Sequence, residues 1–192
     1  MDIDLIPTPW QTVGPYFAIS LAGGHSIEHI AGPNAKGERV KLMCAMFDGE
    51  GQGVDEALIE IWQANADGRY NHPDDTQDKP VDPDFLGFGR QATDENGICV
   101  FETIRPGRVP GPNGTMQAPH LAVSVLARGI LRRLPTRIYF AGDPANEKDP
   151  VLALVPKERR ETLMAQPVAN QPGAWRFDIH LSGANETVFF DV

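Results

Sequence analysis

One histidine stands at a position from which a β-strand could present a metal ligand. The stretch APHLAVSV (residues 118–125) has the composition of a strand, and His120 lies near its start. Side chains two residues apart in a strand lie on the same face, so a His-x-His pair there would chelate iron, copper or zinc. The residue two positions after His120 is Ala122, which has no donor atom. His120 is therefore a ligand completed from elsewhere, a relic of a lost site or an ordinary buried histidine.

Four arginines form a second candidate site. They are Arg128, Arg132, Arg133 and Arg137, the densest basic cluster in the chain. A guanidinium fork suits a carboxylate in a partly dry pocket. Because the chain as a whole is acidic, with a net charge of -9, local positive charge is needed to attract an anion. The alternative is that these arginines pair with surface carboxylates, and such pairs stabilise a fold by only about 0–1 kcal/mol.

The composition of the chain is that of a globular protein. Its 192 residues fit one domain, and the hydrophobic share of 41% is enough for a substantial core. The negative charge argues against nucleic-acid binding, which depends on an excess of Lys and Arg. No run approaches the roughly 18 apolar residues that a membrane span requires. We expect one domain over residues 1–192 that binds neither nucleic acid nor membranes.

The start of the chain and its cysteines indicate the cell compartment. The first residues, MDIDLIPTPW, lack the basic and apolar regions of a signal peptide. Cys44 and Cys99 both lie in apolar runs, as expected of reduced cysteines that pack as small hydrophobes. We therefore expect a cytoplasmic protein.

Stretches of strand type follow one another and are separated by turn residues. The most regular is AWRFDIHL, in which Trp175, Phe177 and Ile179 share one face. A single stretch, PKERRETLMAQ (residues 156–166), has a helical pattern, with proline at a plausible first position. Short strands between turns predict an all-β fold, either a β-sandwich or a barrel. The candidate strands are residues 39–48, 57–64, 98–104, 120–127, 136–141 and 174–181.

Two connections are too long for simple hairpins. Residues 65–89 and 105–119 are rich in Pro, Gly, Asp and Asn. Long loops on a β scaffold commonly carry function or contact a partner. The N-terminal arm, residues 1–38, also has little periodic pattern, and we expect it to extend onto a neighbour or to wrap its own domain.

The stretch LIEIWQANADGRY (residues 58–70) resembles the signature of the intradiol ring-cleaving dioxygenases. The resemblance extends from about residue 8 to about residue 181. It implies a β-sandwich with long loops and a ferric iron held by two tyrosines and two histidines. The other stretches that agree, in the same order, are TPWQTVGPYF, GFGRQATDENG, FETIRPG, PHLAVSV, RIYFAGDP and FDIHL.

The resemblance implies that half of the iron ligands are missing from this chain. Tyr70 stands at the first tyrosine position and His120 at the first histidine position. Val109 stands where the second tyrosine belongs and Ala122 where the second histidine belongs, and neither side chain has a lone pair. The implied site is vestigial: it holds no metal and no catalytic residue. A hydrogen bond between Tyr70 and His120 could persist in it.

The resemblance further implies a two-chain enzyme. In such enzymes an alpha chain keeps the fold without metal, a homologous beta chain binds Fe(III), and active sites form between the chains of a larger hetero-oligomer. The chain resembles the alpha type. The implied substrates are protocatechuate, an anionic dihydroxybenzoate, and O2, and the implied product is 3-carboxy-cis,cis-muconate. The implied substrate contacts are Arg133, from the basic cluster, and Thr12, Gly14 and Pro15, from the stretch TVGPY.

Two other functions compete with this expectation. One is an iron enzyme that draws unusual ligands from elsewhere in the chain. The other is a metal-free β-sandwich binding module of the same ancestry, without dioxygenase activity and without a dioxygenase partner. A close homologue with Tyr at the Val109 position and His at the Ala122 position would favour the two-chain enzyme over both.

Overall fold

The computed structural model describes residue 9, residues 11–22 and residues 24–191. The first eight residues of the expected N-terminal arm therefore lie outside the description, as does Trp10. The described chain is all-β, which confirms the predicted fold class. Its strands are β1 (Arg39–Phe47), β2 (Leu58–Trp62), β3 (Phe88–Ala92), β4 (Ile98–Ile104), β5 (His120–Leu126), β6 (Leu134–Phe140), β7 (Met164–Pro167) and β8 (Ala174–His180).

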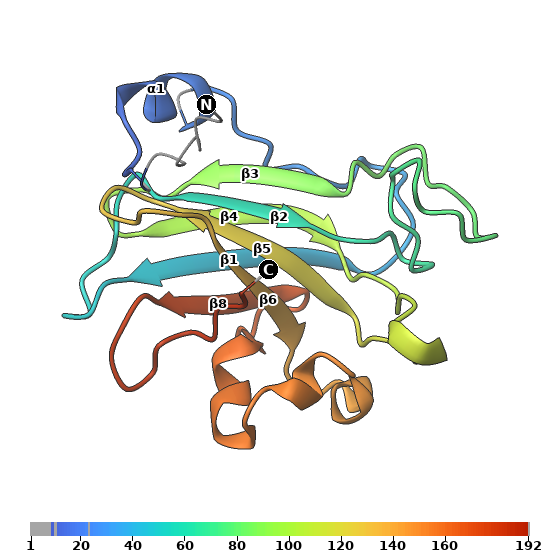
Figure 1. Ribbon diagram of the computed structural model, residues 1–192. Helices are drawn as coiled ribbons and strands as arrows, with labels where there is room; N and C mark the ends of the chain where they lie inside the picture. The colour runs from blue at the N-terminus through green and yellow to red at the C-terminus, as the bar shows by residue number, and fades with distance from the viewer. Residues whose placement is uncertain (1–8, 10, 23, 192) are drawn as a thin grey trace, which may run out of the picture.

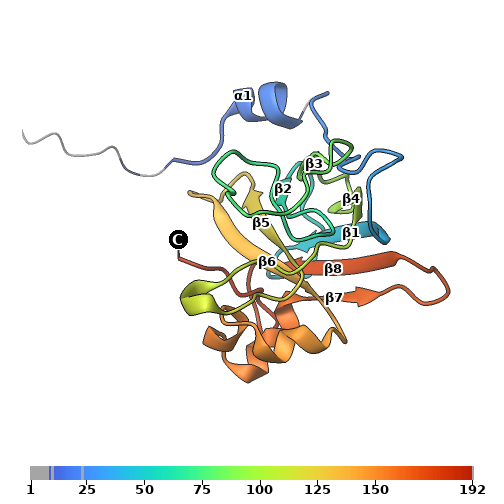
Figure 2. The same ribbon diagram turned by 90° about the vertical axis from the view of Figure 1, so that its right-hand side faces the viewer.

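The strands form one curled sheet in the order β3-β2-β5-β6-β7-β8-β1-β4. The β1–β8 and β6–β7 pairs are parallel, and the other neighbours are antiparallel. The sheet curls until its two edge strands meet, as Figure 1 and Figure 2 show. At the meeting point Gln91 of β3 donates a hydrogen bond from Nε2 to the carbonyl oxygen of Val100 on β4, at 3.1 Å. The result is a sandwich-like, nearly closed sheet.

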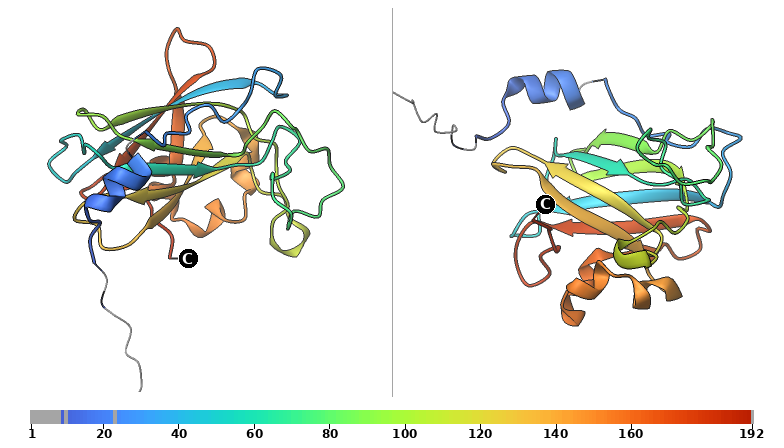
Figure 3. Two further views of the ribbon diagram at one scale, coloured as in Figure 1. Left: turned by 90° about the horizontal axis from the view of Figure 1, so that it is seen from above. Right: turned by 45° about the vertical axis from the view of Figure 1, so that its right-hand side comes forward.

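Part of the N-terminal arm covers the gap between the two edge strands. The backbone amide of Ile27 donates to the carbonyl oxygen of Arg90 on β3 at 2.7 Å, and that of Ile30 donates to Glu102 on β4 at 2.9 Å. The arm thus satisfies edge groups that would otherwise remain open for pairing. Farther upstream, a short helix α1 (Pro15–Phe17) continues as a π-helix (Ala18–Ala22) and stands away from the strands (Figure 3).

The alternation of each strand explains the core. On β1 the side chains of Val40, Leu42, Cys44 and Met46 point inward and are buried, because every second residue of a strand shares a face. Cys99 of β4 is the direct partner of Cys44 in the antiparallel ladder, and both are free thiols in the interior. The hydrogen bond between the two thiols, and after it burial, raises the pKa of Cys44 well above its usual value. These cysteines therefore pack as hydrophobes, as predicted.

The stretch expected to form a helix at residues 156–166 is divided between two elements. Lys157–Leu163 form a 3-10 helix, and Met164 begins β7. Residues 164–166 form a strand rather than a helix because their backbone pairs with strands on both sides. Met164 is the partner of Tyr139 on β6, and Gln166 is the partner of Arg176 on β8. This pairing joins the two halves of the sheet. The remaining 3-10 helices are Pro112–Gly114, Pro144–Lys148 and Leu152–Leu154.

The two long loops pack together at one end of the sheet. The amide of Gly107, from the second loop, donates to the carbonyl oxygen of Asn65, from the first, at 2.8 Å. The Lys79 ammonium donates to the carbonyl oxygens of Gly68 and Arg108, which again joins the two loops. This loop pair lies where β2 ends and β5 begins. Among the described residues, every helix is too short or too polar to span a membrane.

Candidate functional site

The outward face of β2, β5 and β6 carries the residues that could do chemistry. Trp62 of β2 is the ladder partner of Ala122 on β5, and Ala122 is the partner of Arg137 on β6. These three side chains therefore lie in a row across the sheet. Their chain neighbours Leu121 and Ile138 point the other way, into the core. The row is thus an aromatic ring, a methyl group and a guanidinium, side by side.

A cleft of about 610 Å³ opens beside this row. Trp62 and Tyr70 form its aromatic wall: their rings are stacked with centroids 5.9 Å apart and planes within 5°. Tyr70 is held by a hydrogen bond from its backbone amide to Oδ2 of Asp75, at 2.7 Å. The full lining is Trp62, Tyr70, His72, Asp74, Asp75, Thr76, Gln77, Val109, Pro110 and Gln117.

The structure brings the four predicted ligand positions to this end of the sheet. Tyr70 and Val109 line the cleft together, one from each long loop. Ala122 lies on β5 next to Trp62 of the cleft wall, and His120 precedes it on the same face. The pKa of Tyr70 is raised, mainly by burial, so its hydroxyl stays protonated at neutral pH. These four positions therefore lie at one end of the sheet, and two of them, Val109 and Ala122, carry no donor atom.

His120 is a neutral, buried histidine. Its side chain is 4% exposed, and its Nδ1 lies 2.8 Å from the carbonyl oxygen of Ala118. Burial, and after it the positive charge of Arg137, lowers the pKa of His120 to about 4. Its ring is tilted against Tyr139, with centroids 5.8 Å apart. Among the hydrogen bonds of the described residues none joins His120 to Tyr70, so the contact considered from the sequence does not form.

Arg137 places a positive charge beside Ala122 and near His120. Its Nη1 donates to Oε1 of Gln117 at 2.7 Å and to the hydroxyl oxygen of Tyr139 at 3.4 Å. The Tyr139 hydroxyl in turn donates to Oδ1 of the fully buried Asp149, at 3.1 Å. Burial raises the pKa of Tyr139, which keeps this hydroxyl a donor. Gln117 of the cleft lining, Arg137, Tyr139 and Asp149 thus form a chain of hydrogen bonds that runs into the interior.

These residues do not fit a ferric iron. Tyr70 and His120 are the two ligand positions that carry donor atoms, whereas Val109 is a buried hydrocarbon and Ala122 a methyl group. The guanidinium of Arg137 adds a cation where a metal would have to bind, which opposes a second positive charge. Among the described residues there is no cluster of three or more His, Cys, Asp or Glu side chains that could hold a metal.

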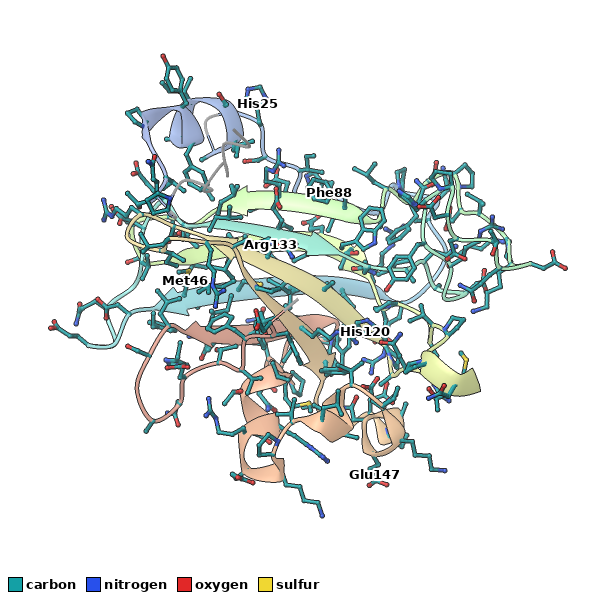
Figure 4. The ribbon with its side chains drawn as sticks, in the orientation of Figure 1. His25, Met46, Phe88, His120, Arg133 and Glu147 are labelled. Carbon is teal, nitrogen blue, oxygen red and sulfur yellow. The ribbon has the colours of Figure 1, made fainter. Side chains whose placement is uncertain are left out.

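A second region lies at the other end of β5, around the loop to β6, and Figure 4 labels Arg133 and His120 toward these two ends. Arg133 is exposed, and its Nη1 donates to Oγ of Ser124 at 3.4 Å. It lines a hollow of about 400 Å³ with Phe189 and Phe190. Among the described residues no carboxylate lies within 4.0 Å of Arg133.

The other arginines of the basic cluster are engaged. Arg128 donates to Asp55 at 2.5 Å, and Arg132 lies 4.0 Å from Asp191. Arg137, as described above, lies on the sheet face beside the cleft and donates to Gln117 of its lining. The four arginines predicted as one cluster therefore separate into two surface pairs, one residue beside the cleft, and Arg133, which has no carboxylate partner in the described part of the chain.

The N-terminal segment TVGPY lies beside the same loop. Oγ1 of Thr12 accepts a hydrogen bond from the amide of Gly129 at 2.8 Å. Gly14 is extended, and Pro15 is the first residue of α1, where its fixed φ angle suits a helix start. The structure thus brings Thr12 and Arg133 to one loop, although the sequence separates them widely.

Large hydrophobic side chains are exposed at this end of the molecule. Tyr16 and Ile19, on the helical segment, are 79% and 64% exposed, and Leu131, in the loop between β5 and β6, is 55% exposed. Exposed apolar groups gathered beside an unpaired charge are typical of a protein–protein interface.

Sequence reasoning missed the role of Arg137 and Gln117 at the cleft. Arg137 belongs to the basic cluster by sequence, because it follows the other arginines closely. It differs from them in that residue 137 lies inside a predicted strand, where it shares a face with Tyr139 two residues later. Its position beside Ala122 depends on the pairing of two strands, which one sequence does not reveal.

Comparisons with known proteins agree with this geometry. A family model described as Dioxygenase matches residues 13–183. The alpha chain of protocatechuate 3,4-dioxygenase from Burkholderia cepacia is 43% identical over 96% of this chain and 97% of its own length. The beta chain of that name from the same organism is 37% identical over 79% of this chain and 67% of its own. Among solved structures, a dioxygenase domain from Streptomyces sp. SirexAA-E covers 93% of this chain and 100% of its own, with a TM-score of 0.64 and 27% identity.

Proposed function

The chain belongs to the intradiol dioxygenase family, and we propose that it is the alpha subunit of a protocatechuate 3,4-dioxygenase. The observation that carries the proposal is the pair Val109 and Ala122, which removes two iron ligands from a fold that is otherwise kept. The similarity to an alpha chain over nearly the full length of both proteins supports it. The similarity to a beta chain supports a partnership of two homologous chains.

In the proposed complex the partner beta chain holds the Fe(III), and the substrates are protocatechuate and O2. The ferric iron supplies the redox chemistry by which the ring opens between its two hydroxyl-bearing carbons, giving 3-carboxy-cis,cis-muconate. Both atoms of O2 enter the product, so no further reductant is consumed. This chain contributes no catalytic residue. Its part is to complete the pocket of the partner and to hold the two chains together in a larger alpha–beta oligomer of the cytoplasm.

Arg133 is the residue that we assign to the carboxylate of the substrate. Its exposed guanidinium has no carboxylate partner among the described residues, so its charge is available to a ligand. A carboxylate and a guanidinium form short, charge-assisted hydrogen bonds, which also fix the direction of the ring. Within a pocket closed by the partner this attraction would be stronger than at an open surface, because less water screens it.

Thr12, Gly14 and Pro15 form the proposed mouth of the pocket on the alpha side. The hydrogen bond from Gly129 to Thr12 anchors this segment beside the loop that carries Arg133. Gly14 has no side chain, so backbone can come close to a ligand there. The exposed Tyr16 and Leu131 would be covered by the partner chain, which removes apolar surface from water.

Ring cleavage by separate and combined chains tests the proposal. This chain, an iron-binding beta chain and the co-expressed pair would be assayed for the loss of protocatechuate and for the muconate product. The proposal predicts activity of the pair and none of this chain alone. A pair that co-purifies and cleaves protocatechuate no faster than the beta chain alone would contradict the pocket-completing role. Failure to associate with any beta chain would favour the metal-free binding module.

A further inference from the structure

The cleft beside Ala122 has the features of a second ligand site. Ala122 stands between Trp62, which lines the cleft, and Arg137 in the row across β2, β5 and β6, and its methyl group is the smallest of the three side chains. The cleft of about 610 Å³ is within the range of small-molecule sites, which is roughly 300–1,000 Å³.

The Arg137 guanidinium retains donors for a ligand. Its Nη1 is the nitrogen that makes hydrogen bonds, and both acceptors, Gln117 and Tyr139, are neutral. Among the described residues, Nε and Nη2 of Arg137 have no hydrogen-bond partner, and neither is among the buried unsatisfied atoms. Solvent therefore reaches them. No carboxylate of the described residues lies within 4.0 Å of Arg137, so its charge is not neutralised by an ion pair.

Two carboxylates, Asp74 and Asp75, line the cleft, and each has a partner in its own loop. Asp75 accepts hydrogen bonds from the amide of Tyr70 and from both the amide and the side chain of Gln77. Asp74 is 91% exposed and lies 3.7 Å from His72. Asp149 lies behind the Tyr139 hydroxyl, in the interior. A ligand that reached Arg137 would meet a cation with no carboxylate of the described residues within 4.0 Å.

We propose that this cleft binds a small aromatic carboxylate, with the Arg137 guanidinium holding the carboxylate and the walls of Trp62 and Tyr70 packing against the ring. A planar ring suits aromatic walls, and a carboxylate suits the fork of an arginine. Val109 and Pro110 add apolar surface, which favours a ring over a small inorganic anion. The identity of the acid rests on the proposed function, because protocatechuate is the ring acid which that complex would meet.

Calorimetric titration of the alpha–beta complex with 4-hydroxybenzoate tests the proposal. This probe keeps the ring and the carboxylate but lacks the second hydroxyl, so intradiol cleavage does not consume it. We expect two equivalents per alpha–beta pair, one in the partner's active site and one in this cleft. The variant Arg137→Gln, which removes the charge, should leave one equivalent. Two equivalents retained in Arg137→Gln, or one equivalent in the unchanged complex, would overturn the proposal.

Two further variants separate the cleft from the catalytic pocket and from a folding defect. Ala122→Met fills the space between Trp62 and Arg137 without a change of charge, and it should also remove one equivalent. Arg133→Ala should weaken the other equivalent instead. Ring cleavage by the same samples reports the proposed function separately. A complex that cleaves protocatechuate but binds one equivalent contradicts the second site alone, whereas two equivalents without cleavage contradict the proposed function alone.

Discussion

The two ends of β5 differ in how their charged groups are satisfied. At the His120 end the charge of Arg137 is connected through Tyr139 to the buried Asp149, and His120 itself is neutral. At the loop end Arg133 is exposed and has no carboxylate partner among the described residues. A buried polar group needs hydrogen-bond partners within the same chain. A charged group at the surface can instead pair with a group of another molecule.

This difference indicates which end still has a function in catalysis by the proposed complex. We propose that the His120 end corresponds to the iron site of the family. Its internal hydrogen bonds contribute to the stability of this fold. The loop end combines an unpaired cation with exposed apolar side chains and with the anchored segment at Thr12. We therefore expect substitutions of the buried residues at the first end to change stability, and substitutions at the second to change binding of the substrate to the catalytic pocket and assembly.

The largest effect is expected at Asp149, beneath the first end. Its carboxylate accepts hydrogen bonds from the amides of Ala118 and Leu152 and from the Tyr139 hydroxyl. Asp149→Ala leaves these buried donors without partners and should lower the free energy of unfolding by about 3–5 kcal/mol. Urea denaturation measures the free energy of unfolding, and Asp191→Ala, at an exposed carboxylate, is the control. Equally small losses of stability in both variants would contradict the view that the hydrogen bonds of Asp149 stabilise the fold.

Arg133→Ala should act on substrate binding at the second end. Loss of a charge-assisted hydrogen bond worth about 1.5–3 kcal/mol corresponds to a rise in KM for protocatechuate of about 10- to 100-fold. The KM for catechol, which has no carboxylate, should change little, and the stability of the chain should not change. Steady-state assays of the complex measure both constants. Arg128→Ala, which removes the arginine paired with Asp55, is the control. An equal rise for both substrates would exclude a carboxylate contact.

His120 gives the first end a predictable pH dependence. Its pKa in the folded chain, about 4, is below the ordinary value of 6.5, so the unfolded chain binds a proton first as the pH falls. The stability that neutral His120 contributes is present above pH 6.5 and is lost as the pH falls toward 4. Between neutral pH and about pH 5 the loss should be about 1–2 kcal/mol.

Comparison with His120→Gln checks this pH dependence, because glutamine does not titrate. Urea denaturation at both pH values should give a smaller loss of stability in the variant than in the unchanged chain. The same loss in both would show that other groups cause the acid sensitivity. KM for protocatechuate should be the same in both proteins at neutral pH, since His120 lies at the end of β5 away from Arg133.

The smallest effect is expected from Thr12→Val. This variant removes the acceptor for the amide of Gly129, an exposed hydrogen bond worth about 0.5–1.5 kcal/mol. Thr12→Ser keeps the acceptor and is the matched control. We expect a several-fold weaker association with the beta chain and an unchanged urea midpoint. Analytical ultracentrifugation of the mixed chains measures the association, and an effect of Thr12→Ser as large as that of Thr12→Val would argue against the hydrogen bond.

Strand alternation made much of the fold predictable. The core faces of β1 and β8 follow directly from their apolar pattern. Two strands were not predicted, because FGRQA (β3) and MAQP (β7) lack the branched and aromatic residues of a typical strand. They are strands because their neighbours pair with them, and for β7 this pairing also shortened the expected helix. That residues 1–192 form one domain stays a prediction.

The candidate site was predictable where it depends on residue type and not where it depends on pairing. The ligand positions Tyr70, Val109, His120 and Ala122 were named from the resemblance, and the structure brings them to one end of the sheet. The cation beside them was not predicted. Arg137 lies next to Ala122 because β5 and β6 are paired in this register, and one sequence does not reveal that pairing. The roles of Arg133, Thr12, Gly14 and Pro15 in substrate binding remain proposals.

The iron content of the separate chains tests the central claim most directly. This chain would be purified alone and as a complex with a beta chain, and iron would be measured per polypeptide together with ring-cleaving activity. The account predicts no iron in the isolated chain and about one ferric ion per alpha–beta pair, as expected of one complete ligand set in the pair. Stoichiometric iron in the isolated chain would mean that other residues replace the ligands missing at Val109 and Ala122, which would contradict the account.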